Sequence, residues 1–146
     1  MRIVGLDVGE RRIGVAVADE RARVALPVAV IERRVLPTDL DAIARLVQEQ
    51  GAEVIVIGLP ISLNGSLGPQ AQAVEAFGRE LSARLPLPIE YWDERLSTVE
   101  AQRRLASAGH RGPKAKARRD ALAAAIILQG YLDHQAQASP SSPFES

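Results

Sequence analysis

The chain has 146 residues, of which 47% are hydrophobic and 25% charged, and its formal net charge is zero. This composition is typical of one globular domain that can bury a core without disulfides or a structural metal. The absence of cysteine excludes disulfides and cysteine-ligated metal centres, so any metal must bind oxygen or histidine. No apolar stretch is long enough to span a bilayer and no signal peptide is recognisable, so we expect a cytoplasmic protein without a membrane partner.

The first part of the sequence predicts three antiparallel strands. Apolar, β-branched runs at Arg2–Val8 and Ile13–Ala18 flank a short polar turn, which is typical of a hairpin. A third such run covers Val24–Ile31. Pro27 removes a backbone donor from this third strand, so we expect the strand to lie at an edge of the sheet.

The next part predicts helices that alternate with parallel strands. Helical spacing of apolar residues follows Pro37, with Thr38 or Asp39 as the expected N-cap and Gly51 as the stop. The unbroken apolar run Val54–Ile57 is typical of an interior strand that is parallel to the first. Four more elements are expected: a helix from Pro69 to about Leu85, a strand at Pro88–Trp92, a helix from Ser97 to about Ala108, and a final helix that begins near Pro113.

The predicted order βββαβαβαα indicates an α/β fold with right-handed crossovers. We expect a five-stranded mixed sheet, made of an antiparallel meander and further parallel strands, with helices on both faces. Residues 1–137 are assigned to this single domain, and residues 138–146, which are rich in Ser and Pro, to a disordered C-terminal tail.

Asp7 is the first candidate for chemistry. It interrupts an apolar strand near its end, where an unpaired carboxylate would be costly to bury, so it needs a compensating cation. A salt bridge to Arg11 or Arg12, or hydrogen bonds from backbone donors in the turn at Gly9, are the structural alternatives.

Two further acidic positions lie far from Asp7 in the sequence. Asp93 and Glu94 follow the fifth strand, and because side chains alternate along a strand, at most one of them should face the same site as Asp7. Alternatively, either is an acid favoured by the dipole of the helix that begins at Ser97. Asp120 lies in the last helix, where a surface acid would be ordinary.

Together, three carboxylates from separate segments indicate a site for Mg²⁺ or Mn²⁺. Two such ions about 4 Å apart would activate an attacking water and stabilise the leaving oxygen of a phosphodiester. His110 and His134 have no Ser or Cys nucleophile that the sequence places beside them, so a metal-dependent hydrolysis is favoured.

The segment from Arg103 to Arg119 is basic and contains no Asp or Glu. It predicts a positive surface that contacts phosphates, although a solvated helix face is as common an interpretation of such a run. The loop Gly58–Ser66 also offers amides and polar side chains that could hold a phosphate, but a simple connector fits it equally well. The basic residues taken as nucleic-acid contacts are Arg111, Lys114, Lys116 and Arg118.

Four motifs occur in order along the chain: Gly5–Ala16, Gly58-Leu59-Pro60 with Asn64-Gly65-Ser66, Asp93–Thr98 and Asp120-Ala121. They resemble those of the YqgF family, bacterial proteins with an RNase H-like fold described as Holliday-junction resolvases or pre-16S ribosomal RNA nucleases. The resemblance covers nearly everything up to the tail. The chain departs from the family pattern at Ile61–Asn64, where members often have a more polar stretch.

The resemblance implies that Asp7, Glu94 and Asp120 are the catalytic, metal-binding triad, which selects Glu94 over Asp93. It also implies that Arg12, Asn64 and Arg95 lie near the site, and we predict that these three residues contact nucleic acid.

The expected activity is therefore that of a metal-dependent nuclease, with precursor ribosomal RNA as the favoured substrate and branched DNA as the second. The expected state is a monomer or a homodimer. The remaining alternatives are a non-catalytic nucleic-acid-binding module and an ATP-binding domain of the actin-like and sugar-kinase type.

Overall fold

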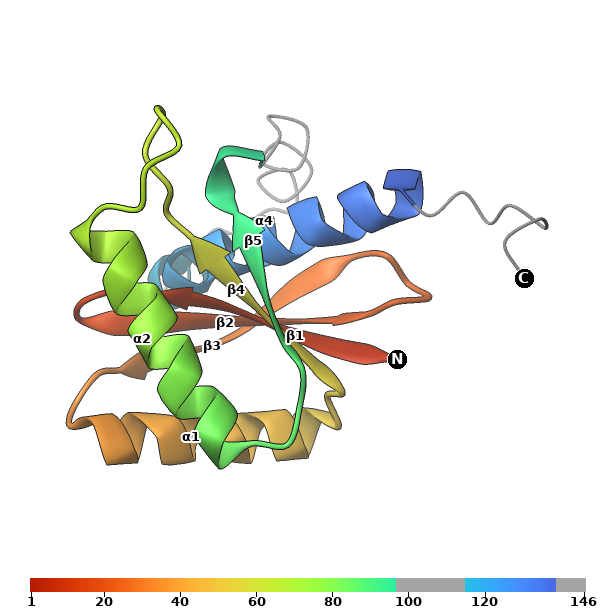
Figure 1. Cartoon of the computed structure of the whole chain (residues 1–146). Coiled ribbons are helices and arrows are strands. Elements are labelled where there is room, and N and C mark those ends of the chain that lie inside the picture. The colour runs from red at the N-terminus through yellow and green to blue at the C-terminus, as the bar shows by residue number, and fades with distance from the viewer. Residues whose placement is uncertain (97–114, 139–146) are drawn as a thin grey trace.

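A computed structural model describes the backbone of residues 1–96 and 115–138 and the side chains of residues 1–96 and 121–136 (Figure 1). The helix predicted from Ser97 to about Ala108 lies outside the described residues, as does the predicted tail beyond Ala138. No helix in the described parts of the chain has the length and apolar character needed to cross a membrane.

Five strands form one mixed sheet in the order β3-β2-β1-β4-β5. The first three strands pair antiparallel, and β4 pairs parallel with both β1 and β5, which confirms the predicted architecture. The strands are β1 (Arg2–Val8), β2 (Arg12–Asp19), β3 (Ala25–Glu32), β4 (Val54–Leu59) and β5 (Ile89–Asp93).

Strand β3 lies at an edge of the sheet, as its proline predicted. The pairing of β2 with β3 shifts by one residue, because Val15 pairs with Ala29 while Ala16 pairs with Pro27. Val28 is thus an extra residue on the edge strand. The irregularity sits next to the proline, which has no N–H to donate to a neighbouring strand.

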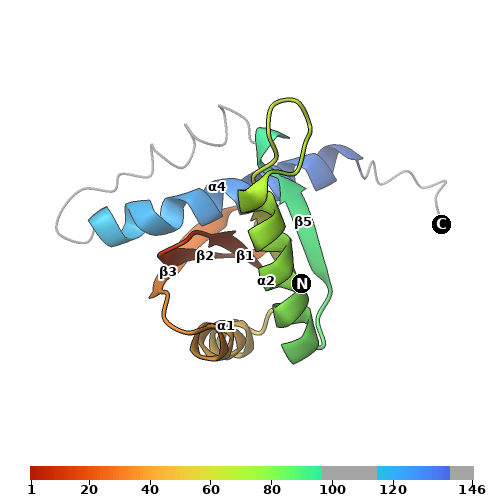
Figure 2. The ribbon, with the colours of Figure 1, turned by 60° about the vertical axis from the view of Figure 1, so that its left-hand side comes forward.

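Within residues 1–96 and 115–138, three α-helices cover the two faces of the sheet: α1 (Leu36–Gln50), α2 (Pro69–Arg84) and α4 (Ala115–Ala138). Figures 1 and 2 show α1 and α2 on one side and α4 across the other. Two separate clusters of buried side chains correspond to these two layers. Val4, Leu6 and Val8 of β1 belong to the first cluster and Ile3 belongs to the second, so successive side chains of β1 alternate between the faces.

The start of α1 differs from our expectation. The N-cap is Val35, so the prediction of Thr38 or Asp39 was wrong. Pro37 is accommodated inside the first turn, where its missing N–H has no helical partner to lose. Asp39 lies in that turn, is buried, and accepts a hydrogen bond of 2.9 Å from the backbone N–H of Arg34. The helix ends as predicted, with Gly51 in the left-handed conformation.

Glycines allow α4 to pack closely on the sheet. A Cβ atom added to Gly5 of β1 would lie 2.8 Å from Cβ of Leu128, and one added to Gly58 of β4 would lie 2.9 Å from Cγ1 of Ile127. The backbone of α4 therefore lies directly over β1 and β4, the two strands whose C-terminal ends lie at the candidate site.

Replacing Gly5 by alanine should destabilise the protein by about 1–3 kcal/mol, because the new methyl group would overlap Leu128 and force the helix away from the sheet. Urea unfolding followed by Trp92 fluorescence measures this change. Gly68→Ala is the matched control, since the nearest atom there, Oγ of Ser62, lies 3.8 Å away. A loss below about 0.5 kcal/mol for Gly5→Ala, which is usual for neutral surface changes, would contradict the close packing.

Candidate active site

Asp7 faces the α4 side of the sheet near the C-terminal end of β1. Its neighbours Leu6 and Val8 are buried in the opposite layer, against α1 and α2, so alternation places the carboxylate on the face that Gly5 presents to α4. The side chain is half-buried. A charged group therefore lies at the boundary between the core and the end of the sheet.

The Asp7 carboxylate has no hydrogen bond or salt bridge within the described residues. The backbone N–H of Gly9 instead donates to the carbonyl of Arg12 at 2.9 Å, and the Arg12 guanidinium pairs with Glu32 at 3.3 Å. Burial raises the pKa of Asp7 above its ordinary value. The structural alternatives that we considered for Asp7 thus find no support in this part of the chain.

Glu94 lies beside Asp7 although it comes from a distant segment. It is the first residue of a 3₁₀ turn, η1 (Glu94–Leu96), which follows β5 directly. Its Cγ lies 3.3 Å from the position that a Cβ on Gly58 would take, so it packs against the end of β4. Burial raises the pKa of Glu94 most, and the negative charges of Asp7 and then of Asp93 raise it further. Two half-buried carboxylates therefore repel each other at this end of the sheet.

Asp93 has a different environment from its neighbour Glu94. Its carboxylate accepts hydrogen bonds from the backbone N–H of Arg95 at 2.9 Å, from Nε at 3.0 Å and from Nη2 at 2.7 Å. These side-chain hydrogen bonds from Arg95 lower the pKa of Asp93. The negative charge of Asp93 is thus balanced by Arg95, whereas Glu94 has no cationic partner among the described residues.

Asp120 lies in α4 by its backbone, and its side chain is outside the described set. It precedes Ala124 by four residues, and the carbonyl of Ala124 lies 3.4 Å from the Cβ position on Gly5. No group of three acidic or histidine side chains that could hold a metal occurs among the side chains that the structure describes. Of the three predicted ligands, only Asp7 and Glu94 have side chains in the described set.

The residues predicted to contact nucleic acid fall in several places. Arg12 begins β2 and pairs with Glu32. Asn64 is exposed, and its Oδ1 accepts hydrogen bonds from the backbone N–H and the hydroxyl of Ser66, at 3.0 and 2.7 Å. Arg95 is held by Asp93. Lys116 and Arg118 lie in the first turns of α4 by their backbone alone, and Arg111 and Lys114 lie outside the described residues.

Sequence reasoning missed the pairing of Asp93 with Arg95. A signal was present, because an aspartate often accepts a hydrogen bond from the backbone N–H two residues later. We had predicted that Asp93 is either an alternative to Glu94 or an acid favoured by the dipole of the following helix. The structure instead gives Asp93 a partner of its own.

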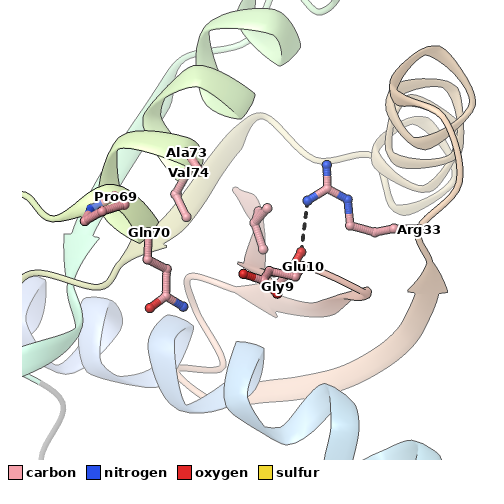
Figure 3. A pocket seen from close by; sticks show the side chains of 8 residues that line it. Gly9, Glu10, Arg33, Pro69, Gln70, Ala73 and Val74 are labelled. Carbon is pink, nitrogen blue, oxygen red and sulfur yellow. Dashed lines mark hydrogen bonds between the residues drawn. The ribbon is translucent and has the colours of Figure 1, made fainter.

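A cavity of about 490 Å³ lies on the other face of the sheet, between the turn after β1 and the start of α2 (Figure 3). Arg33 lines one side of it, opposite α2, and its Nη1 donates to the carbonyl of Gly9 at 2.9 Å. The cavity is lined by Val8 and by α2, so it is separate from the site around Asp7. Its lining residues are Val8, Gly9, Glu10, Arg33, Pro69, Gln70, Ala73 and Val74.

Comparison with known proteins assigns the chain to a family. Residues 1–134 match the model of RuvX, which is described as a Holliday junction resolvase. The chain belongs to this family. RuvX corresponds to the YqgF group predicted from the sequence motifs.

Curated relatives of this family member carry nuclease names. A protein from Moorella thermoacetica is 49% identical over 137 residues, which cover 94% of this chain and 98% of that protein. One from Chloroflexus aurantiacus is 47% identical over 131 residues, which cover 90% of this chain and 86% of that protein. Both are named "Putative pre-16S rRNA nuclease". The chain is therefore a member of a nuclease family.

Solved structures confirm the RNase H-like fold. RuvC from Thermus thermophilus matches with a TM-score of 0.60 and 12% identity, over 92% of this chain and 96% of that one. The yeast mitochondrial Holliday junction resolvase matches with a TM-score of 0.55 and 14% identity, over 97% of this chain and 82% of that one.

The raised pKa of Asp7 predicts a pH-dependent cost to folding. Between the unfolded and folded pKa values the folded state holds more protons, so the cost grows as pH rises and is absent below the unfolded value. Asp7→Asn should therefore stabilise the protein in chelator at about pH 7, and the gain over wild type should vanish near pH 3. Thermal unfolding of both proteins across this range measures the difference.

Asp93→Asn is the control of opposite sign. The pKa of Asp93 is lowered by Arg95, so its charged form contributes stability above the unfolded pKa, and this contribution is lost as pH falls through the folded value. The substitution should therefore destabilise the protein at about pH 7. Equal shifts for both variants would contradict the distinction between the two carboxylates.

Proposed function

We propose that this protein is a metal-dependent nuclease that hydrolyses phosphodiester bonds, with Asp7, Glu94 and Asp120 as its catalytic metal ligands. One observation carries the proposal. The half-buried carboxylates of Asp7 and Glu94 come from β1 and from the turn η1 after β5, lie close enough to raise the pKa of Glu94, and have no cationic partner within the described residues.

A divalent cation fits this arrangement. Mg²⁺ and Mn²⁺ prefer carboxylate oxygens, and a shared cation would relieve both the desolvation and the mutual repulsion of the two acids. The helical position of Asp120, one turn before the residue that packs over Gly5, supports its role as a third ligand. When bound, such ions activate a water molecule and stabilise the charge on the leaving oxygen of a phosphodiester.

The protein's own residues would supply position and electrostatics. Asp7 is held by the central strand and Glu94 by the turn after β5, so both side chains start from rigid elements and need little reorganisation. The basic residues Arg111, Lys114, Lys116 and Arg118 would contact the phosphate backbone, which positions nucleic acid without reading its sequence. The surrounding segment has no acid before Asp120, which supports this assignment.

Precursor ribosomal RNA is the favoured substrate, because the close relatives are named as pre-16S rRNA nucleases. That role would place the protein in the cytoplasm. Branched DNA is the second candidate, since the family model is described as a Holliday junction resolvase. Resolution of a symmetric junction would require a homodimer, whereas RNA trimming can be carried out by a monomer.

Removing a single ligand should abolish metal-dependent cleavage. We expect Asp7→Asn, Glu94→Gln and Asp120→Asn each to lower kcat at least about 100-fold in Mn²⁺, because even outer partners of metal ligands are worth about 10–100-fold. Glu49→Gln is a matched control, since Glu49 is an exposed acid on α1, on the other face of the sheet. Residual cleavage above about a tenth of wild type in the Asp7 variant would refute the assignment.

A competition experiment separates the two substrates. Purified protein with Mn²⁺ is incubated with equal amounts of a single-stranded precursor RNA and a DNA four-way junction, and cleavage of each is followed on a gel. We expect the RNA to be cut. Cleavage of the junction alone, together with a dimer in analytical ultracentrifugation, would establish the resolvase function instead.

A further inference from the structure

The loop between β4 and α2 forms a preorganised arm. Residues 60–68, called the arm here, project beyond the ends of the strands in both views (Figures 1 and 2). The backbone N–H of Ser62 donates to the carbonyl of Ser66 at 3.1 Å, and that of Gly65 donates to the carbonyl of Ser62 at 2.8 Å. Asn64 adds two hydrogen bonds to Ser66, and Gly65 adopts a φ of 84°, which glycine tolerates without strain. The arm thus has a defined shape before any substrate binds.

Arg95 connects this arm to the end of β5, directly before Glu94. Its Nε and Nη2 donate to Asp93, and its Nη1 donates to the carbonyl of Ser62 at 3.4 Å. The same Nη1 lies 3.8 Å from the position of a Cβ on Gly65. Three of the five N–H donors of this guanidinium are therefore directed at protein oxygens. We call this arrangement the Asp93–Arg95 latch.

The tip of the arm exposes an apolar side chain. Leu63 is 96% exposed, and Leu67 in the arm and Leu96 after Arg95 are also exposed. Within the arm, the Oδ1 of Asn64 accepts both of its hydrogen bonds from Ser66. The most exposed large apolar side chain of the arm is Leu63, which cannot bind a phosphate but can pack on the face of a base, as apolar side chains do when they insert beside unstacked bases.

We propose that Asp93 and Arg95 are positioning residues that hold the arm beside Glu94, so that Leu63 packs against an unpaired base next to the cleaved phosphate. The proposal rests on the proposed nuclease function. It adds a substrate class, nucleic acid with an unpaired nucleotide at the cleavage point. It also changes the expected role of Arg95 from a nucleic-acid contact to a structural link.

A charge exchange tests the latch. Asp93→Arg and Arg95→Asp should each raise KM for an RNA oligonucleotide about 10-fold with a smaller change in kcat, and the double variant should recover to within about 3-fold because the pair is restored in reverse order. The proposal is overturned if the double variant does not recover and Arg95→Asp is more defective than Asp93→Arg. That result would show that Arg95 contacts phosphate.

Hydrogen–deuterium exchange gives a readout that needs no catalysis. The amides of Ser62 and Gly65 should exchange faster in Arg95→Gln than in wild type and return to wild-type rates in the double exchange variant. This milder substitution also serves if a charge reversal prevents folding. Unchanged exchange in Arg95→Gln would refute the latch, even in a protein that cleaves nucleic acid normally.

The role of Leu63 is tested by binding. An oligonucleotide with a single unpaired 2-aminopurine is titrated with Asp7→Asn protein, so that cleavage does not interfere. Leu63→Ser should remove the fluorescence change on binding, whereas Leu63→Phe should retain it. Leu26→Ser is the control, because Leu26 is an exposed leucine of the edge strand β3, and it should have no effect. The same response in Leu63→Ser as in its parent would refute the base contact. A wild-type protein that shows the latch and the fluorescence change but cleaves nothing would refute the nuclease function alone.

Discussion

The electrostatic repulsion between Asp7 and Glu94 is the constraint around which the site is built. Each carboxylate is partly removed from water, and each lacks a cationic partner within the described residues. Burial of this kind disfavours the charged form and therefore disfavours folding at neutral pH. A protein retains such a pair where a ligand compensates it, and a divalent cation is the compensation that two carboxylates favour most.

The packing of α4 makes this arrangement possible. Gly5 and Gly58 have no side chains where the helix crosses β1 and β4, so Leu128 and Ile127 lie against the strands themselves. Glu94 then packs over Gly58 at the end of β4. Gly5 and Gly58 thus allow the close contact between helix and sheet. They also allow α4, β1 and the turn after β5 to meet at one end of the sheet. Here the stability of the fold and the geometry of the site depend on the same contacts.

Asp93 and Glu94 show how two adjacent acids can acquire different properties. Arg95 neutralises Asp93 and lowers its pKa, while burial and the charge of Asp7 raise the pKa of Glu94. One carboxylate therefore makes a structural contact, and the other has no cationic partner among the described residues. This division also links the site to the arm, because the guanidinium that holds Asp93 reaches the carbonyl of Ser62.

The sequence determined the strands, their order and the edge position of β3, because alternation, a proline and an unbroken apolar run act locally. It also placed Asp7 as an acid that the core could not explain. It did not determine where α1 begins, since Pro37 fits inside a first turn as well as before one. Nor did it separate Asp93 from Glu94 by spacing. That distinction has a local part, the contact of Asp93 with Arg95 two residues later, and a non-local part, the approach of Glu94 to Asp7. Tertiary packing alone brings about the second, because the two acids lie far apart in the sequence.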